Sequence, residues 1–236
     1  MSPFYALAAT LAVVVVLVLT TLYLLNRFVW FYRDPVRTPE STEANAIISP
    51  ADGQVVYIKR FTDGAVESEK LGRLIQLTEL TDLKLPEHSA GWIIGIYMSP
   101  FDVHFNYAPL PGTVRSIAYT KAKANLPMVD LWEYIRFTYL RRAVDNFTEK
   151  FHLTNERNSL LVEGPGFDYA VIEIADKFVN KISCYVREGL AVEPGTKVGF
   201  IDRGSQVDLI IYKSDIDFRV KPGQQVYGAK TVLATY

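Results

Sequence analysis

The sequence is poor in the residues that build disulfide bonds and metal sites. Its 236 residues include one cysteine, Cys184, and three histidines, His88, His104 and His152. A single cysteine excludes an intramolecular disulfide and a cysteine-rich zinc site. A site made of histidine and cysteine would need nearly every such residue in the chain. We therefore expect no metal cofactor.

The chain also lacks an excess of charge of either sign. Lys and Arg number 25 and Asp and Glu number 26, so the formal net charge is −1. A protein that binds nucleic acid through bulk charge needs a basic excess, so we expect no nucleic-acid partner. Apolar residues make up 49% of the chain, which is enough for a sizeable core in one large domain or two small ones.

Charged side chains are absent from residues 1–26, and the stretch 6–25 (ALAATLAVVVVLVLTTLYLL) is apolar almost throughout. A helix of that length spans about 30 Å, the thickness of a bilayer core. Arg27 and Arg33 follow, and the residues between them include Trp30, Phe31 and Tyr32, a pattern typical of the cytoplasmic membrane interface. A cleaved signal peptide fits less well, because no Lys or Arg precedes the apolar run. We expect one anchor over residues 1–32 in the cell membrane, with the rest of the chain in the cytoplasm.

Polar residues and prolines separate this stretch from the remainder. Residues 33–46 (RDPVRTPESTEANA) predict a linker, and residues 47–236 predict the folded domain. Short strand patterns dominate the domain and are bounded by Gly and Pro. The strand-like segments are 47–61, 91–99, 112–122, 159–164, 169–175 and 181–186.

Turn glycines shortly before a valine recur in the domain. They lie in PADGQV (50–55), PLPGTV (109–114), EPGTKVG (193–199) and KPGQQVYG (221–228). Such hairpins suit a folded-over β architecture like the barrel-sandwich of swinging-arm carrier domains. Residues 127–151 instead predict one amphipathic helix, packed on the sheet or lying at the membrane interface. We expect an α+β fold that is mostly β: antiparallel sheets with barrel-sandwich-like hairpins, an N-terminal transmembrane helix and one amphipathic helix.

Three short segments hold side chains that could react together. Asp52 lies in a Pro-Ala-Asp-Gly turn, His104 follows a strand in SPFDVH, and Ser205 follows Gly204 between two strand-like runs. A histidine is the natural general base near neutral pH, and with a carboxylate it can activate a serine. Taken singly, each is also explained by a turn or a structural histidine. Ser205 lacks the G-x-S-x-G setting of a hydrolase, but glycine leaves the preceding carbonyl open to attack.

Five segments in order carry a family resemblance. FYRDPVRTPE, IISPADGQVV, YMSPFDVHFNYAPLPGTV, NERNSLL and a late Gly-Ser resemble the phosphatidylserine decarboxylases. The short form, in which a membrane segment precedes F-x-R-D-P, is the nearest likeness, and it spans roughly residues 28–236. The resemblance implies a lyase of phospholipid biosynthesis, made as a zymogen that generates its own pyruvoyl cofactor.

The resemblance also implies two reactions. Ser205 attacks the Gly204 carbonyl, and elimination releases residues 1–204 as the β chain. Loss of ammonia leaves a pyruvoyl group at the head of the α chain, residues 205–236. That group forms a Schiff base with phosphatidylserine, or an archaeal analogue, and accepts the electrons left as CO2 departs. Phosphatidylethanolamine is the product, and whether the lipid is a diacyl or an ether form stays open.

The family's motif positions imply roles for single residues. His104 becomes the proton carrier and Asp52 its orienting carboxylate. Phe101, Phe105 and Tyr107 flank His104, and we expect some of them to line the substrate entrance, with plain core aromatics as the alternative. The implied partners are a membrane phospholipid, the two chains of one precursor and a second copy in a homodimer.

The sequence departs from the family pattern in two places. Tyr107 stands three residues after His104, where many members carry a second histidine. Arg203 precedes and Gln206 follows the Gly-Ser pair, where short-form members commonly have Phe and Arg. Two other functions stay open: a membrane-anchored barrel-sandwich adaptor without catalysis, whose chain stays intact, and a serine hydrolase that uses Ser205 without cleavage.

Overall fold

The structure is a computed structural model. It describes residues 3–41, 43–68, 72–86, 89–122, 124–140, 142, 145–147, 150–177, 182–202 and 205–236. The chain divides into two compact units, Met1–Pro35 and Val36–Tyr236.

The first unit is a long apolar helix. Helix α1 (Pro3–Leu25) continues into a short π-helix, η1 (Asn26–Trp30). Every described residue of α1 is exposed, although the helix is apolar on all sides. Within the described residues, Pro3–Trp30 is the one helical stretch that is long and apolar enough to cross a membrane. The guanidinium of Arg33 lies 4.4 Å from the centre of the Trp30 ring, which places an aromatic and a cation together after the apolar run.

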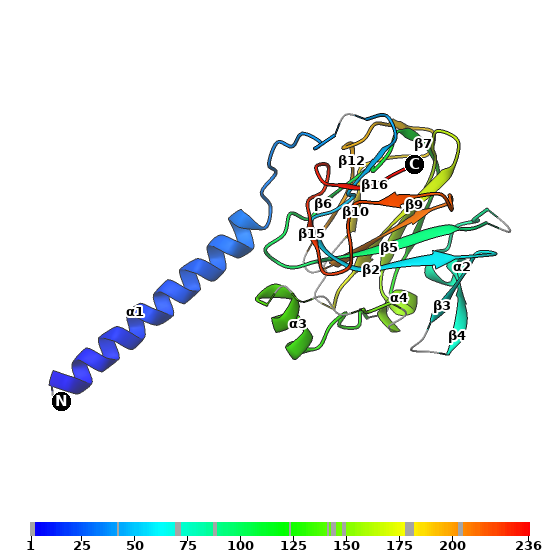
Figure 1. Cartoon of the computed structure of the whole chain (residues 1–236). Coiled ribbons are helices and arrows are strands. Elements are labelled where there is room, and N and C mark those ends of the chain that lie inside the picture. Colours follow the sequence, from blue (N-terminus) through cyan, green and yellow to red (C-terminus); the bar gives the residue numbers. More distant parts are fainter. Residues whose placement is uncertain are drawn as a thin grey trace. The chain divides into compact units, whose positions relative to one another are not determined.

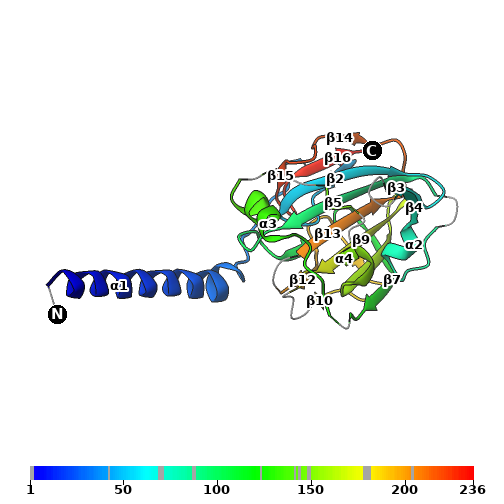
Figure 2. The same cartoon turned by 90° about the horizontal axis from the view of Figure 1, so that it is seen from below.

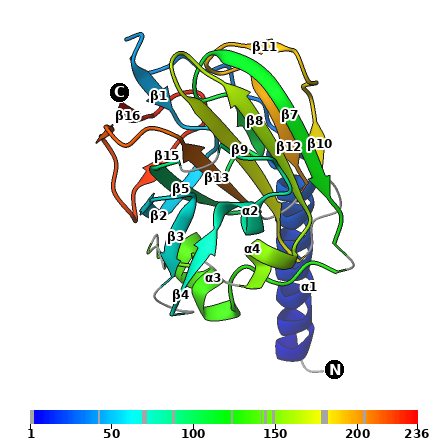
Figure 3. The same ribbon diagram turned by 90° about the vertical axis from the view of Figure 1, so that its right-hand side faces the viewer.

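An eight-stranded antiparallel sheet forms the centre of the second unit (Figure 1). Its strand order is β11-β7-β8-β9-β13-β5-β2-β15, and it curls in Figure 3. The strands are β2 (Gly53–Phe61), β5 (Gly91–Met98), β7 (Gly112–Thr120), β8 (Arg157–Glu163), β9 (Asp168–Ala175), β11 (Ala191–Val192), β13 (Ser205–Ile211) and β15 (Gln225–Val226). Strand β13 lies between β9 and β5 (Figure 2) and every one of its residues is buried.

Smaller elements cover both faces of this sheet. On one face lie two three-stranded sheets with the orders β1-β16-β14 and β10-β12-β6. Their strands are β1 (Ala46–Ile48), β6 (Phe105–Tyr107), β10 (Ile182–Cys184), β12 (Lys197–Ile201), β14 (Asp217–Phe218) and β16 (Val232–Thr235). The other face carries a hairpin and three short helices. These are β3 (Ala65–Ser68), β4 (Arg73–Gln76), α2 (Leu77–Leu80), α3 (Leu131–Thr138) and α4 (Lys150–Thr154).

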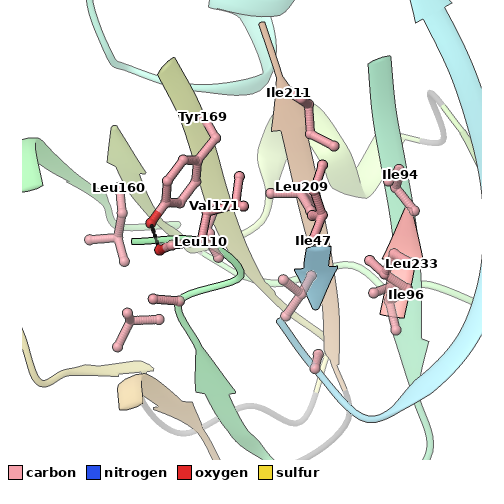
Figure 4. Close-up of a cluster of buried hydrophobic side chains, with 14 of the residues drawn as sticks. Ile47, Ile94, Ile96, Leu110, Leu160, Tyr169, Val171, Leu209, Ile211 and Leu233 are labelled. Carbon is pink, nitrogen blue, oxygen red and sulfur yellow. Dashed lines mark hydrogen bonds between the residues drawn. The ribbon is translucent and has the colours of Figure 1, made fainter. Parts of the chain in front are cut away.

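The alternation of side chains along β13 divides the core into two layers. Val207 and Leu209 belong to the cluster under the small sheets, and we call this the inner face. Ile210 belongs to the cluster under the helices, the outer face. Figure 4 shows the inner layer, where the Tyr169 hydroxyl donates to the carbonyl of Leu110 at 2.7 Å. Since successive residues of a strand point to opposite sides, Ser205 lies on the inner face and Gln206 on the outer.

The architecture confirms the mostly β, antiparallel fold expected from the sequence. The segments predicted at 91–99, 112–122 and 169–175 form β5, β7 and β9. Residues 47–61 form two strands, β1 and β2, separated by a turn as predicted. β1 pairs with β16 and β2 pairs with β5 and β15, so this segment does not form a hairpin.

The helix predicted over residues 127–151 is divided in two. α3 begins at a capping box, in which the Asp130 carboxylate accepts from the Glu133 N–H at 2.7 Å and Glu133 accepts from the Asp130 N–H at 3.1 Å. Before α4, the Asp145 carboxylate accepts from the Phe147 N–H at 2.9 Å. Such a local bond offers the backbone an alternative to helix just before α4.

Candidate functional site

Ser205 is the first residue of β13, in the middle of the large sheet. Its side chain is fully buried, and the ladder pairs it with Met98 of β5 and Ala175 of β9. The hydroxyl donates to the Met98 sulfur at 3.2 Å, which is a weak acceptor. Gly204, the other half of the predicted cleavage site, lies outside the described residues, as does Arg203. The predicted nucleophile is therefore held on a central strand with only weak competition for its hydroxyl proton.

His104 is brought to the same end of the sheet by β12. The N–H of Ile201 donates to the His104 carbonyl at 3.2 Å, and Ile201 precedes Ser205 by four positions. The imidazole is fully buried, and its Nδ1 lies 3.0 Å from the carbonyl oxygen of Asp102. A carbonyl oxygen can only accept, so the neutral ring carries its proton on Nδ1. Nε2 then holds the lone pair that can take up a proton.

The turn that leads into His104 is held by the Asp102 carboxylate. One oxygen accepts from the N–H of Ser99 at 2.8 Å and from its hydroxyl at 2.7 Å. The other oxygen accepts from the Gln225 amide at 2.9 Å. These bonds fix the turn, and the turn places the Asp102 carbonyl that orients the imidazole.

Asp52 forms a buried ion pair with Arg37, a residue that the sequence placed in the linker. Arg37 Nη2 donates to Asp52 Oδ2 at 2.8 Å and Nη1 donates to Oδ1, a two-pronged arrangement. The carboxylate also accepts from the N–H of Gly228 at 2.8 Å and of Val103 at 3.4 Å. The Asp52 carboxylate therefore bonds to the backbone N–H of Val103, the residue before His104. The imidazole Nδ1 itself bonds to the Asp102 carbonyl and not to Asp52.

The three aromatic residues predicted to line an entrance lie in different surroundings. Phe101 is 41% exposed, and its ring centre is 6.3 Å from that of Tyr139, just after α3. Phe105 is partly buried, with its ring centre 4.9 Å from that of Phe200. Tyr107 is buried. Phe101 and Phe105 are thus accessible enough to meet a ligand, and Tyr107 has the surroundings of a core residue.

Tyr107 packs directly against the segment that holds Asp52. A Cβ atom on Gly228 would lie 2.8 Å from the Tyr107 ring, so the close approach requires glycine. The Arg37 guanidinium donates to the Gly228 carbonyl at 2.7 Å and lies 6.0 Å from the centre of the Tyr107 ring. Tyr107 therefore helps to fix the Arg37–Asp52 pair, a structural role at the position where many family members carry a second histidine.

A second buried acid, Glu173 of β9, lies on the inner face two residues from the strand partner of Ser205. Asn158 donates to its Oε2 at 2.7 Å, while Oε1 has no hydrogen-bond partner in the described part of the chain. Burial raises the pKa of Glu173 from 4.5 to about 8, and the Asn158 bond opposes this. A Cβ on Gly199 would lie 2.1 Å from the carboxylate, so the acid fits against bare backbone.

The outer face behind Ser205 carries a polar cluster, which we call the Gln206 cluster. Its members are Tyr57, Asn146, His152, Gln206 and Asp208, each 3% exposed or less. Burial raises the pKa of Asp208 from 3.8 to about 7, opposed by hydrogen bonds from Tyr57 and Gln206. Burial and the nearby Asp208 raise the pKa of the Tyr57 hydroxyl well above 10.

The sequence held signals for these residues that pattern reading passed over. In SQVDLII, polar residues recur at alternate positions of an apolar run, which indicates polar groups facing a core. His152 was counted as a histidine without a role, and Glu173 lies inside the apolar strand YAVIEIA. Two residues of the NERN motif bond to β9. Asn158 donates to the Glu173 carboxylate, and Asn155 donates to the carbonyl of Ala175 at 2.7 Å. This motif therefore supports the strand beside Ser205.

The chemistry that these groups offer is proton transfer beside a nucleophile. His104 has a basic nitrogen, and Ser205 supplies the hydroxyl. Among the residues that the structure describes, no group of three or more His, Cys, Asp or Glu could hold a metal ion.

Comparison with known proteins gives one consistent family. Residues 24–234 match the family described as phosphatidylserine decarboxylase. The chain is 30% identical over 206 residues to a phosphatidylserine decarboxylase proenzyme of Magnetococcus marinus, covering 87% of this chain and 76% of that protein. It is 31% identical over 206 residues to a putative archaetidylserine decarboxylase proenzyme of Methanocaldococcus jannaschii, with coverages of 87% and 88%. It is 30% identical over 239 residues to a phosphatidylserine decarboxylase proenzyme of Burkholderia mallei, with coverages of 98% and 91%.

Proposed function

The chain belongs to the phosphatidylserine decarboxylase family, and we propose that it is a phospholipid decarboxylase that makes its own pyruvoyl group from Ser205. The observation that carries the proposal is the burial of Ser205 at the start of a central strand, at the same end of the sheet as His104. Relatives named proenzymes support a chain that is converted after synthesis. The substrate is phosphatidylserine or its archaeal ether counterpart, and the products are the ethanolamine lipid and CO2.

Self-cleavage, in this proposal, begins at the Ser205 hydroxyl. His104 Nε2 takes up the hydroxyl proton and Oγ attacks the Gly204 carbonyl carbon. The peptide bond then breaks as His104 passes this proton to the nitrogen of residue 205, which leaves an ester and a free amino group. Removal of the α-proton of residue 205 expels the Gly204 carboxylate as the end of the β chain, residues 1–204. The remaining dehydroalanine takes up water and loses ammonia, which leaves a pyruvoyl group heading the α chain, residues 205–236.

The surroundings of Ser205 fit such a group. A carbonyl cannot donate a hydrogen bond, and the present acceptor of the Ser205 hydroxyl is the weakly accepting sulfur of Met98. When the Ser205 hydroxyl is converted to a carbonyl, the acceptor that loses its hydrogen bond is therefore only the weakly accepting Met98 sulfur. The group supplies a carbonyl that condenses with the substrate amine and takes up the electrons released with CO2. His104 returns a proton to the carbon that loses CO2, and Asp52 holds the His104 segment through the Val103 N–H.

We assign residues 1–32 to a membrane anchor, 33–46 to a linker and 47–236 to the catalytic domain. The apolar stretch Pro3–Trp30 supports the anchor, and Arg27 and Arg33 after it favour a cytoplasmic domain. An anchor would hold the enzyme at the surface that contains its lipid substrate.

Pairing of processed units in a homodimer rests on the family resemblance. Light scattering of the detergent-solubilised enzyme checks it, and a mass of one β plus one α chain contradicts the dimer.

Helix α3 and the residues after it offer a face suited to lipid. Its exposed apolar and aromatic side chains, among the described residues, are Leu131, Trp132, Tyr139 and Leu140. Apolar and aromatic groups beside a cation, here Arg136, are typical of helices at the headgroup level. The contact of Tyr139 with Phe101 extends this face to the turn before His104, which supports Phe101 as part of the substrate entrance. Brominated lipids in nanodiscs should quench the fluorescence of Trp132, measured against Trp132→Phe; equal quenching in both contradicts this assignment.

The mass of the intact purified protein tests the proposed function, with Ser205→Ala beside it. We expect two chains, one ending at Gly204 and one beginning with a pyruvoyl group, and a single full-length chain for the variant. A wild-type chain that stays whole after long incubation at neutral pH contradicts the proposal and favours the adaptor. An intact chain whose Ser205 is labelled by a fluorophosphonate probe favours the hydrolase.

A further inference from the structure

The proposed chemistry leaves the Gln206 cluster without a role. Ser205 faces the inner layer of the core, whereas Gln206 and Asp208 face the outer layer among apolar side chains. Removing so many polar groups from water is unfavourable unless they bond to one another. The cluster is therefore a costly feature placed one residue from the predicted cleavage point.

Gln206 is at the centre of the cluster. Its Oε1 accepts from the Asn146 amide at 2.7 Å. Its Nε2 lies 2.9 Å from the Tyr57 hydroxyl, 2.8 Å from Asp208 Oδ1 and 2.9 Å from His152 Nε2. The Tyr57 hydroxyl also donates to Asp208 Oδ1 at 2.7 Å and lies 3.1 Å from His152 Nε2. The two hydrogens of Nε2 are shared among its three neighbours, and this one side chain thus contacts groups from β2, from β13, from α4 and from the segment before α4.

His152 is fixed in this position by aromatic rings. The Phe151 ring stacks on the imidazole at 4.1 Å between ring centres, and the Phe147 ring meets its edge at 6.1 Å. Phe147 also packs edge-on against Tyr57 at 5.0 Å. Residues 145–147 and 150–154 therefore hold two partners of Gln206, Asn146 and His152, in place independently of the β13 ladder.

The position of Gln206 matters because of what cleavage does to β13. Before cleavage Ser205 continues into the preceding chain, and afterwards residue 205 is a chain end with Gln206 next to it. Strand ends fray, and a frayed end would move the reactive group away from His104. We propose, on the basis of the proposed function, that the Gln206 cluster clamps the new end of β13 and positions the pyruvoyl group after cleavage.

Gln206 and His152 are positioning residues in this proposal, because they touch neither substrate nor the reacting atoms. The clamp acts through Gln206 side-chain bonds on the face of the sheet opposite to the chemistry. The proposal has two consequences. The clamp has little effect on β13 while the chain is whole, and it has a strong effect on the position of residue 205 once the chain is cut.

The test uses full-length Gln206→Met, which keeps the length of the side chain but removes its hydrogen bonds. Ile210→Val is the matched control, since Ile210 is equally buried on the same face of the same strand. Three quantities are measured: the extent of cleavage by intact mass, kcat and KM per pyruvoyl-bearing chain, and hydrogen exchange of the amides at 206–208. Exchange is compared between processed protein and the uncleaved Ser205→Ala background.

For Gln206→Met we expect near-complete cleavage and a fall in kcat of about ten- to a hundredfold, with KM little changed. Amide exchange should rise at least about tenfold in processed protein and little in the uncleaved background. Ile210→Val should resemble the wild type. His152→Gln, which keeps a hydrogen-bonding group, should retain more turnover than His152→Phe.

Wild-type kcat and exchange in Gln206→Met overturn the clamp, as does an exchange increase of the same size before and after cleavage. If Gln206→Met and His152→Phe both remain uncleaved, the cluster acts before cleavage and the proposal is wrong. A wild-type chain that never cleaves refutes the proposed function itself, so the two failures are distinguishable.

Discussion

The two faces of β13 hold the side chains of its first two residues in opposite ways, although each face also has buried oxygens without a hydrogen-bond partner among the described residues: Glu173 Oε1 on the inner face, and Asn146 Oδ1 and Asp208 Oδ2 on the outer. On the inner face the Ser205 hydroxyl meets a thioether, and one oxygen of Glu173 has no partner within the described residues. On the outer face Gln206 is bonded at both ends of its amide by neighbouring side chains. Reactive groups need weak competition for their protons and lone pairs, whereas positioning groups need many strong bonds. One strand provides both because its side chains alternate.

The largest expected effect is on the inner face. His104→Asn removes the basic Nε2, so we expect self-cleavage to slow by about 10²- to 10⁴-fold, the usual contribution of a general base. The half-time of cleavage, followed by intact mass, measures it. Cleavage at the wild-type rate would assign the proton transfer to another group.

The second largest effect is expected on stability, when the buried Arg37–Asp52 ion pair near the inner face loses its arginine. Arg37→Met leaves a buried carboxylate without its partner, and we expect the free energy of unfolding to fall by about 3–5 kcal/mol. Denaturation of the Ser205→Ala background in detergent measures this in a single chain. Arg115→Met is the control, because Arg115 is about half exposed and its pairs with Glu163 and Asp168 contribute about 0–1 kcal/mol. Equal losses in the two variants would contradict a buried pair.

A smaller effect is expected where Glu173 fits against bare backbone. A methyl group in Gly199→Ala would overlap the carboxylate, and we expect destabilisation of about 1–3 kcal/mol. In a Glu173→Ala background, Gly199→Ala should cost less stability than it does in the wild type. We expect the difference in a double-mutant cycle to be about 0.5–3 kcal/mol. Strict additivity of the two losses would show that they do not touch.

Two of the buried acids, Glu173 on the inner face and Asp208 on the outer face, should affect stability over different pH ranges. Both have raised pKa values in the folded chain, about 8 for Glu173 and about 7 for Asp208. The folded state then holds more protons than the unfolded state, so stability falls as pH rises from about 4 to 8, by at most about 1.4 kcal/mol per pH unit for each acid. Glu173→Gln should remove the part of the slope that extends to about pH 8, and Asp208→Asn should remove only a part that ends at about pH 7. Unfolding curves across this range measure it, and unchanged slopes in both variants contradict the assignment.

Much of the fold was predictable because it depends on local pattern. The strands at 91–98 and 168–175 are short apolar runs bounded by turn residues, and such runs form buried strands in most contexts. The helix over 127–151 was predicted too long, because apolar spacing alone does not show where a helix begins and ends, and α3 covers only Leu131–Thr138. Ser205, His104 and Asp52 were predicted as site residues from their motifs, and the structure brings each of them to one end of the sheet.

The rest of the site depends on contacts between distant parts of the chain. Gly228, in the chain between β15 and β16, accepts from Arg37 and donates to Asp52, so a distant segment of the sequence supports this pair. The Gln206 cluster gathers residues from positions 57, 146, 152, 206 and 208, and no local pattern pairs these positions. The alternating polar residues in SQVDLII indicate that polar side chains pack against β13, but they do not identify which residues supply those side chains.

The most direct test of the two-face account is one measurement of intact mass on two full-length variants side by side. The account predicts that His104→Asn stays as one full-length chain under conditions in which Gln206→Met divides into chains of 1–204 and 205–236. The inner face would then perform the cleavage and the outer face would act after it. A cleaved His104→Asn together with an intact Gln206→Met would contradict the account, because the two faces would have exchanged roles.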